Sequence, residues 1–499
     1  MHKILNSEQI KVSWGDLSDL ITTMTPSEKG YFRKSRVGFT GQESASMRIF
    51  DVLERGCKPE TAAIREATDL HEENIYSLRS FLYKHILRSL KSFHLEKSKQ
   101  FALREILDHA EILLGKGLHE QSKRYVQQGI ENSDPHVLPA YQVLFRIQQI
   151  QLLKFLEEDE KITATEEIVD AISHSADIIK HSYIARRGLT KALYFVNRHF
   201  PLRDDTIKQQ TAELLNELLA IPDDPSQNYL MRNSRNAAIS LLYRLLGNWD
   251  AAITFQEKTI RIIEQVDAQL LNRNIPVINA YYNYVSLLLN KGDEIGFNTA
   301  MAQLEASPVS GKAEIRYKEA IVLQLKLDKC IFTKQFSEGA VVVQEAEQFL
   351  TEAHPIPGLR QDMVYRLLVY YIFTRDFDTA LSKLLQLLHA NEPHTLRSFP
   401  VHLRLLQILI HFELKHYLLL PSLIRNTYRF MMQQELYFEV ERVILNFFKR
   451  ILSKSDQQAL SKEFAHLLQQ FNQIENDYNE RLAMHTFFDY KYWVERLRG

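Results

Sequence analysis

Glycine and proline are scarce in this chain. There are 16 and 14 of them in 499 residues, or about 3 % each, against usual frequencies of roughly 7 % and 5 %. Enzymes built from many strand–helix turns use glycine freely in tight turns and phosphate-binding loops, so the shortage argues against the nucleotide-binding α/β class. The hydrophobic content of 45 % and charged content of 25 % are ordinary for a globular protein, which excludes disorder as the main state.

Cysteine is nearly absent as well. Cys57 and Cys330 are far apart and belong to no Cys-x-x-Cys or Cys/His grouping, which argues against a disulfide framework and a zinc site and favours a reducing compartment. The start of the chain has no signal-peptide pattern, and no apolar run approaches the ~18 residues that cross a bilayer. We therefore expect a cytoplasmic protein that makes no membrane contact.

Neither sign of charge is in excess. The chain has 61 Lys and Arg residues against 62 Asp and Glu residues, a net charge of -1, so no global field attracts nucleic acid and any electrostatic partner must use a local patch. The segment from Lys180 to Arg203 contains no acidic residue and offers such a patch. Its other cations are Arg186, Arg187, Lys191 and Arg198, interleaved with Tyr183, Tyr194 and Phe195. Two interpretations stay open: a groove for a phosphate backbone or an acidic peptide, or a polar face paired with neighbouring acidic hairpins.

What the chain does have is helical periodicity. From Pro135 to Pro421 the prolines separate segments of about 13 to 22 residues, the length of ordinary helices. Apolar residues within these segments recur three and four positions apart, as at Leu241, Leu242 and Leu245. No alternating pattern flanked by hairpin turns is found. The sequence therefore predicts an all-α protein.

A short corner pattern also recurs. At Gly247 a turn leads to Trp249 and then, three residues later, to the small residue Ala252. A second copy leads to Ala380, a third and weaker copy leads to Ser122, and a fourth leads to Gly339. The aromatic residue would close the corner of a helical hairpin, while the small residue lets its two helices approach. Because the copies are spaced by multiples of about 41 to 43 residues, the pattern predicts about nine antiparallel hairpins.

The stretch from Gly247 to Ala252, with Ser240 and Thr259 at the two other small-residue positions, resembles the tetratricopeptide-repeat family. Around Ser122, those two positions hold Ala110 and Gly129. The period exceeds the family's ~34 residues and implies longer helices.

We thus predict three parts: an N-terminal helical module over 1–98, a tetratricopeptide-like α-solenoid over 99–471, and a C-terminal capping helix over 472–499. The module is expected to have helices near 14–36, 43–55, 59–68 and 71–98, and the array to contain helical pairs at 139–180 and 182–220.

The resemblance implies that the first helix of each pair lines a concave surface that binds a protein or peptide. The matching positions are Arg104, Glu111, Arg244, Tyr365, Val369, Phe373, His402 and Phe412; Val369 and Phe412 fit the inter-repeat core equally well. The predicted partner-binding residues are Arg244, Tyr365, Phe373 and His402, with Arg186, Arg187, Lys191 and Arg198 for an acidic partner.

No motif points to catalysis. The chain has no Walker loop, no Gly-x-Gly-x-x-Gly and no Gly-x-Ser-x-Gly. His411 and His416 are five residues apart, a spacing that turns side chains to different faces of a helix. We therefore expect no metal ligand, no cofactor and no catalytic residue, and predict a non-catalytic scaffold rather than an enzyme.

The N-terminal helices also allow an alternative function, namely DNA binding. Residues 61–67 lead through Thr68, Asp69 and Leu70 into a long helical segment, a pattern similar to a helix-turn-helix. However, Glu72 and Glu73 stand where a recognition helix usually contacts DNA and would repel phosphates. The alternative is a transcriptional regulator with an N-terminal DNA-binding module and a peptide-sensing repeat domain; the simpler interpretation of 1–98 is a helical cap.

Overall fold

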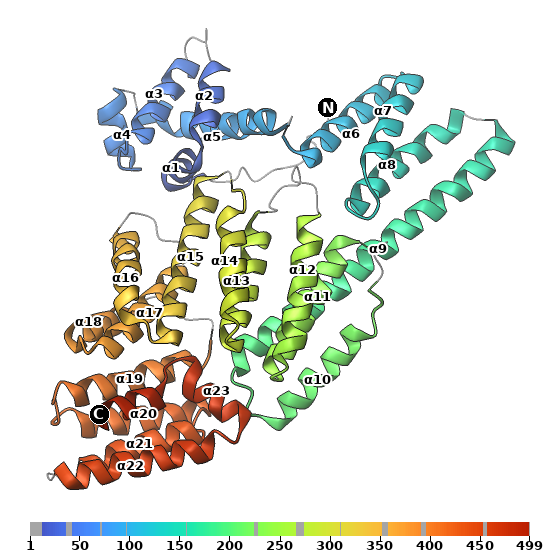
Figure 1. The fold of residues 1–499 in the computed structure, drawn as a ribbon. Helices are drawn as coiled ribbons and strands as arrows, with labels where there is room; N and C mark the ends of the chain where they lie inside the picture. The colour runs from blue at the N-terminus through green and yellow to red at the C-terminus, as the bar shows by residue number, and fades with distance from the viewer. Residues whose placement is uncertain are drawn as a thin grey trace. The chain divides into compact units, whose positions relative to one another are not determined.

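The computed structural model describes residues 12–35, 42–69, 72–95, 97–155, 157–223, 228–265, 274–309, 311–351, 358–390, 396–452 and 457–498. Every regular element in these ranges is helical, so the predicted all-α class is confirmed (Figure 1). Two compact units are present: residues 1–176 with 267–273 and 309–316, and residues 177–266 with 274–308 and 317–499. Among the described helices, none is long and apolar enough to cross a membrane.

The first unit begins with five helices around a core of their own: α1 (Trp14–Thr23), α2 (Pro26–Lys34), α3 (Gln42–Glu54), α4 (Thr61–Thr68) and α5 (Glu72–Leu95). Ile21, Phe32 and Phe50 are buried at its centre. The single helix expected over 14–36 is wrong. Two helices form there because Thr25 caps α2, accepting a hydrogen bond from the Glu28 N–H, and Pro26 takes the first helical position.

The first unit continues with α6 (Lys99–Gly115), α7 (His119–Asn132), α8 (Pro139–Leu152), a 3₁₀ turn (Leu153–Phe155) and the first part of α9 (Glu158–His199). The helical pairs expected over 139–180 and 182–220 are wrong, because α9 is one continuous helix of 42 residues. It contains no proline, and its one glycine, Gly188, packs against Leu218. With no helix breaker before Pro201, the helix crosses the expected boundary.

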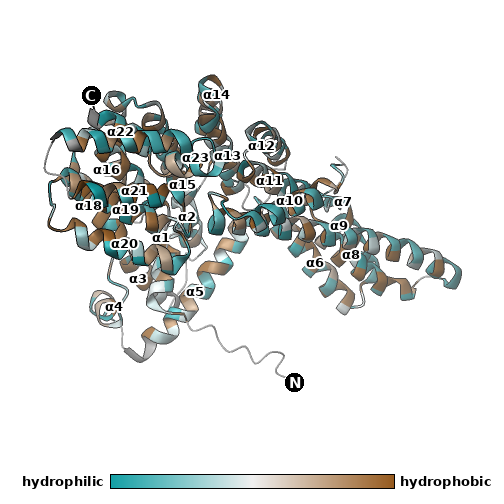
Figure 2. Cartoon of the chain, turned by 90° about the horizontal axis from the view of Figure 1, so that it is seen from below, coloured by the Kyte–Doolittle hydropathy of each residue, from teal (hydrophilic) through white to brown (hydrophobic). Residues whose placement is uncertain are grey.

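The second unit contains the rest of α9 and the helices that follow it. They are α10 (Asp205–Leu219), α11 (Tyr229–Leu245), α12 (Trp249–Glu264), α13 (Asn274–Lys291), α14 (Glu294–Ala306), α15 (Lys312–Thr333, included from Tyr317 onward), α16 (Phe336–Thr351), α17 (Leu359–Thr374), α18 (Phe377–Leu388), α19 (Phe399–Glu413), α20 (Leu420–Gln434), α21 (Glu439–Ile451), α22 (Gln457–Ile474), α23 (Tyr478–Thr486) and α24 (Tyr490–Arg498). Helices α11 to α14 lie side by side (Figure 1). Apolar and polar residues alternate around most helices (Figure 2), as expected where one face is buried.

The corners between paired helices share one backbone conformation. A residue with positive φ occupies each of them: Gly117, Gly247, Gly292, Lys334, Arg375 and Lys415. The next N–H bonds back to the preceding helix, as from Asn248 to the Tyr243 carbonyl at 2.9 Å, which is the Schellman arrangement. Five residues after each corner lies a buried position, namely Ser122, Ala252, Phe297, Gly339, Ala380 and Leu420.

The small residues of a hairpin contact each other directly. The Ser240 hydroxyl donates to the Ala252 carbonyl at 2.8 Å, and the Ser122 hydroxyl donates to the Ala110 carbonyl at 2.8 Å. The same approach of two helices therefore occurs in α11–α12 and in α6–α7, at the positions where the sequence pattern predicts small side chains.

The C-terminal segment differs from the single capping helix expected over 472–499. Helix α22 ends at Ile474, and Asp477 caps α23 by accepting hydrogen bonds from the Asn479 and Glu480 N–H groups. The segment packs on helices far back in the chain. The Trp493 indole donates to Glu413 at 2.8 Å, and Lys334 pairs with Asp489 at 2.9 Å. Because Glu413 ends α19 and Lys334 follows α15, residues 478–498 do more than cover the last helix.

Candidate binding surface on helix α9 and its adjoining cavity

One exposed face of α9 carries alternating cations and tyrosines. We call it the basic stripe: Lys180, Tyr183, Arg187, Lys191, Tyr194 and Arg198. These positions are three or four residues apart, which places them on one side of a helix, and Tyr183 and Tyr194 are 71 % and 56 % exposed. The opposite side, with Ala185 and Ala192, is fully buried. Arg186 is exposed on the flank of the stripe.

The cations of the basic stripe have no acidic partner in the described part of the second unit. Lys180, Arg187, Lys191 and Arg198 are exposed, and no ion pair joins any of them to a carboxylate there. The interpretation in which neighbouring acidic hairpins neutralise this face is therefore not supported by the described contacts. With respect to the described residues of this unit, the stripe presents unpaired positive charge to solvent.

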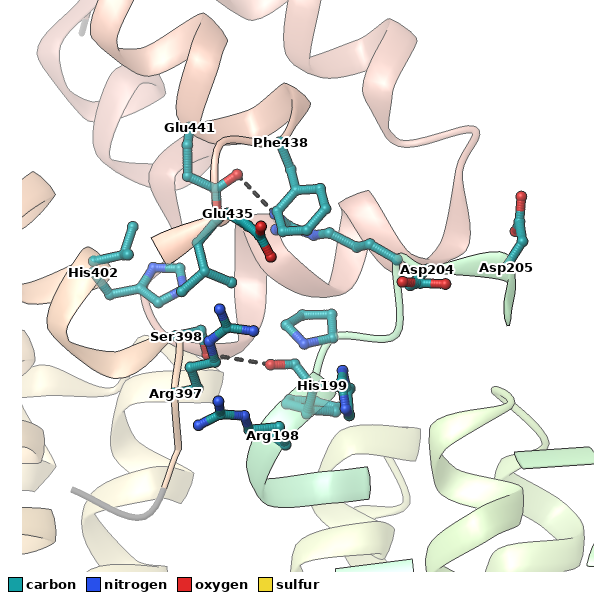
Figure 3. A pocket seen from close by; sticks show the side chains of 15 residues that line it. Arg198, His199, Asp204, Asp205, Arg397, Ser398, His402, Glu435, Phe438 and Glu441 are labelled. Carbon is teal, nitrogen blue, oxygen red and sulfur yellow. Dashed lines mark hydrogen bonds and ion pairs between the residues drawn. The ribbon is translucent and has the colours of Figure 1, made fainter. Parts of the chain in front are cut away.

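The basic stripe ends at a cavity of about 480 Å³, which we call the Arg203 cavity (Figure 3). It is lined by residues 198–205, at the end of α9 and the loop after it, by residues 397–402 at the start of α19, and by residues 435–441 between α20 and α21. Segments far apart in sequence therefore build its walls.

Arg203 is held by two carboxylates. Its guanidinium lies 2.7 Å from Glu441 and 3.4 Å from Glu480, and the side chains of Arg203 and Glu441 are only 6 % and 4 % exposed. Burial raises the pKa of Glu480, and the nearby charge of Glu441 adds to the rise while Arg203 opposes it. A buried guanidinium between two carboxylates ties the loop after α9 to α21 and α23. Arg203 is thus engaged internally.

His402 forms part of the cavity wall without a hydrogen-bond partner. Its side chain is 1 % exposed, its ring stacks on Phe487 with centroids 4.1 Å apart, and neither ring nitrogen has a partner among the described residues. Burial, with the nearby Arg203 charge, lowers the pKa of His402 to about 3. The ring is therefore neutral at physiological pH and presents one donor and one acceptor.

Two guanidinium groups lie together at the end of the cavity nearest the stripe. Arg198 and Arg397 lie next to each other near His199 in Figure 3. Arg397 donates to the Gln434 carbonyl at 2.5 Å, and no described carboxylate pairs with it. Burial, followed by the charge of Arg397, lowers the pKa of His199. Guanidinium groups bind carboxylates and phosphates through paired hydrogen bonds, so this rim continues the chemistry of the stripe.

The predicted partner-binding residues fall into four places. Arg186, Arg187, Lys191 and Arg198 are exposed on α9. Tyr365 and Phe373 contact the C-terminal segment: the Tyr365 hydroxyl donates to the Phe487 carbonyl at 2.6 Å, and Phe373, 2 % exposed, stacks on Phe488. His402 faces the Arg203 cavity. Arg244 lines a different cavity of the same unit.

Two features of the site have no local sequence signal. Arg397 follows residues that carry no motif, and Glu441 pairs with Arg203 across 238 positions. Only the packing of α9, α19 and α21 brings these groups together.

The two histidines expected on different faces of a helix are in fact neighbours. The Nδ1 atoms of His411 and His416 lie 3.0 Å apart, because α19 ends at Glu413 and Lys415, with φ 60°, turns the chain back. Burial, with the adjacent His416, lowers the pKa of His411. Among the described residues, no group of three or more His, Cys, Asp or Glu side chains is arranged to hold a metal ion.

Comparison with known proteins identifies no family: no family model matches the chain, and no curated protein matches it significantly.

Proposed function

We propose that this chain is a non-catalytic helical-repeat scaffold that binds an acidic segment of a protein or peptide partner. The observation that carries the proposal is the basic stripe, where four cations and two exposed tyrosines share one face with no acidic partner in the described part of the unit. Uncompensated charge of one sign beside exposed aromatic rings is characteristic of a recognition surface.

The architecture we propose for residues 99–471 is a tetratricopeptide-like α-solenoid of about nine hairpins. The repeated positive-φ corners and the Ser240–Ala252 and Ser122–Ala110 contacts support it. The long helix α9 interrupts the regular pairing between the α6–α7 and α11–α12 hairpins. A cytoplasmic location fits the two cysteines, which form no disulfide.

The partner would lie along α9. From Lys180 to Arg198 the stripe extends about 27 Å, which matches an extended peptide of about eight residues. Carboxylates of the partner would pair with Arg187, Lys191 and Arg198, and its apolar groups would cover Tyr183 and Tyr194. Arg397 would receive a further carboxylate at the cavity rim. This places the partner on α9 rather than on Tyr365 and Phe373, whose contacts are internal.

The test uses a fluorescein-labelled acidic octapeptide of alternating Glu and Ser, with Gln in place of Glu as the neutral probe. The double variant R187E/K191E is expected to weaken binding of the acidic peptide by about tenfold or more, and binding to the unaltered chain should weaken as salt rises. Fluorescence anisotropy at several salt concentrations measures both effects.

The matched control is R425E/R429E. It reverses two exposed cations with the same spacing on α20 and should leave the affinity within about twofold. Equal loss in both variants would attribute the binding to net charge and contradict a site on α9. Equal affinity for the Glu and Gln peptides would exclude an acidic partner.

A second function, transcriptional regulation through DNA binding, is favoured by one feature of the first unit. Asp69, with φ 54°, follows α4, and α5 begins at Glu72, so the two helices are close in sequence, as the helices of a helix-turn-helix are. Binding of the full chain to duplex DNA at low salt, lost in K84E/R88E, would support a regulator. Absence of binding at about 50 mM salt would remove this function.

A further inference from the structure

A second cavity of about 610 Å³ lies in the second unit, between α11, α13, α15, α17 and the C-terminal segment. We call it the Arg244 cavity. Its volume lies within the range of roughly 300–1,000 Å³ that is usual for small-molecule sites. The aromatic residues that line it are Phe200, Trp249, Tyr282, Phe332, Tyr478, Phe487 and Phe488. A ligand with an aromatic group would thus pack against aromatic side chains of this lining.

Most charged groups of the Arg244 cavity are paired within the protein. Arg366 contacts both carboxylate oxygens of Asp328, at 2.8 and 2.9 Å. Asp489 accepts from Lys334 at 2.9 Å and from His485 at 3.1 Å. Burial alone would raise the pKa of Asp489, but the contacts with His485 and Lys334 hold it below its usual value. These groups therefore need no ligand to balance their charge.

Arg244 differs from them. It lies in the last turn of α11, its Nε is buried without a hydrogen-bond partner, and no carboxylate among the described residues forms an ion pair with it. Its guanidinium lies over the Phe200 ring at 5.5 Å, and the ionisable groups that act on it are the hydroxyls of Tyr282 and Tyr478. Burial lowers the pKa of Arg244, but an arginine in a protein keeps its proton. Among the described residues, the cavity therefore holds a positive charge with no carboxylate partner.

We propose that the Arg244 cavity binds a small organic anion, namely a carboxylate carried by an aromatic group. The Arg244 guanidinium would receive the carboxylate through paired hydrogen bonds, and the surrounding rings would pack against the aromatic group. A monoanion fits better than a phosphate dianion because one guanidinium in the interior is unpaired. Arg481, exposed at the cavity, adds charge outside this contact.

The site is completed by the C-terminal segment. Tyr478 and Arg481 come from α23, and Phe487 and Phe488 follow it, while Arg244 comes from α11. Residues 478–489 therefore form one wall of a site whose anion-binding group lies more than 200 positions earlier in the sequence. The basic stripe contributes no residue to this cavity, so failure of this proposal would leave the proposed function of α9 standing.

The test compares 4-hydroxyphenylacetate with its neutral amide, 4-hydroxyphenylacetamide, by isothermal titration of the full chain. We expect the carboxylate to bind about tenfold more tightly than the amide. The R244M variant should bind the carboxylate only as tightly as the amide. The R481M variant should change the affinity for the carboxylate by no more than about threefold. Without ligand, R244M should melt at the same or a higher temperature, because an unpaired and partly buried charge is removed.

Three outcomes would overturn the proposal. The first is equal affinity of the unaltered chain for the acid and the amide. The second is no binding of the acid up to about 10 mM. The third is tighter binding of phenyl phosphate than of the carboxylate. A lower melting temperature of R244M, together with equal affinity for acid and amide, would assign Arg244 to the stability of α11 instead. Should R244M fail to fold, the melting temperature of the unaltered chain still tests the proposal: it should rise more with the acid than with the amide, and an equal rise would contradict the site.

Discussion

At the scale of single residues, His402 shows how burial keeps a histidine neutral at a position where the sequence alone would allow a protonated side chain. A histidine is ordinarily half protonated near pH 6.5, but His402 is enclosed by Phe487 and the Arg203 cavity, and its pKa is lowered to about 3. A residue predicted to contact a partner is thus neutral in the folded chain, and its burial makes the stability of the fold depend on pH.

The pH dependence follows from the direction of this shift. The unfolded chain binds a proton at His402 below about pH 6.5, whereas the folded chain resists it until about pH 3, so stability falls as pH decreases through this interval. The slope has an upper limit of about 1.4 kcal/mol per pH unit. We expect H402F, which preserves stacking on Phe487, to lose less stability between pH 6.5 and 4.5 than the unaltered chain. Urea unfolding at several pH values measures this difference.

The control for this experiment is H389Q, at an exposed histidine after α18. It should keep the pH dependence of the unaltered chain. If H402F and the unaltered chain lost stability in parallel, the burial of a neutral His402 would be contradicted.

At the scale of elements, the corners of the hairpins control how closely the helices pair. Glycine occupies the left-handed position at Gly117, Gly247 and Gly292, but Lys334, Arg375 and Lys415 adopt the same conformation with a side chain. A left-handed backbone costs a non-glycine residue roughly 1–2 kcal/mol. The later corners therefore store strain that the earlier ones lack.

Substitutions at two corners should change stability in opposite directions. R375G is expected to stabilise the chain by about 1 kcal/mol by relieving the left-handed strain. G247A is expected to destabilise it by about 2 kcal/mol or more, since φ is 81° and a Cβ would lie 2.7 Å from the Tyr478 ring. Chemical denaturation measures both free energies of unfolding.

The matched variant R375A separates strain from charge. It removes the ion pair of Arg375 with Glu413, whose atoms are 4.0 Å apart, but keeps a Cβ at the corner. The left-handed strain therefore remains, and R375A should not stabilise the chain. Stabilisation by R375A equal to that of R375G would show that the side chain, rather than the backbone conformation, carries the effect.

At the scale of the whole molecule, the two units have separate hydrophobic cores. The buried cluster of α1 to α5 includes Phe50 and Leu82 and takes its members from these helices and the turns between them. The large cluster of the second unit extends from Ala192 to Val494 and includes Phe447. Because each core is formed by residues of one unit, each is expected to unfold as its own cooperative unit.

Truncating one core should leave the other intact. We expect F50A, at a fully buried position, to destabilise α1 to α5 by about 3–5 kcal/mol. Amide hydrogen exchange should then rise only in these helices. The paired variant F447A should raise exchange in the second unit alone. Faster exchange in both units from either variant would show that they unfold together.

Local interactions make much of the fold predictable. The periodicity of apolar residues, the prolines between helices and the Gly247 corner act over distances of a few residues, and they predict the all-α class and the positions of Ser122, Ala252 and Ala380. The same local logic fails where a helix breaker is absent, as in α9, or where a proline begins a second helix, as at Pro26. The exposed cations of α9 are likewise visible in the sequence, because an acid-free segment needs no fold to be recognised.

By itself, the sequence determined that the chain is helical, where its corners fall and that α9 carries an acid-free run of cations, because helix formation, capping and charge runs depend on near neighbours. Only the tertiary structure decided that Phe373 and Tyr365 pack on the C-terminal segment, that Arg203 pairs with Glu441, and that Arg244 has no counter-charge among the described residues. These contacts join residues up to 238 positions apart, and they exist only because the packed helices bring those side chains within hydrogen-bonding distance.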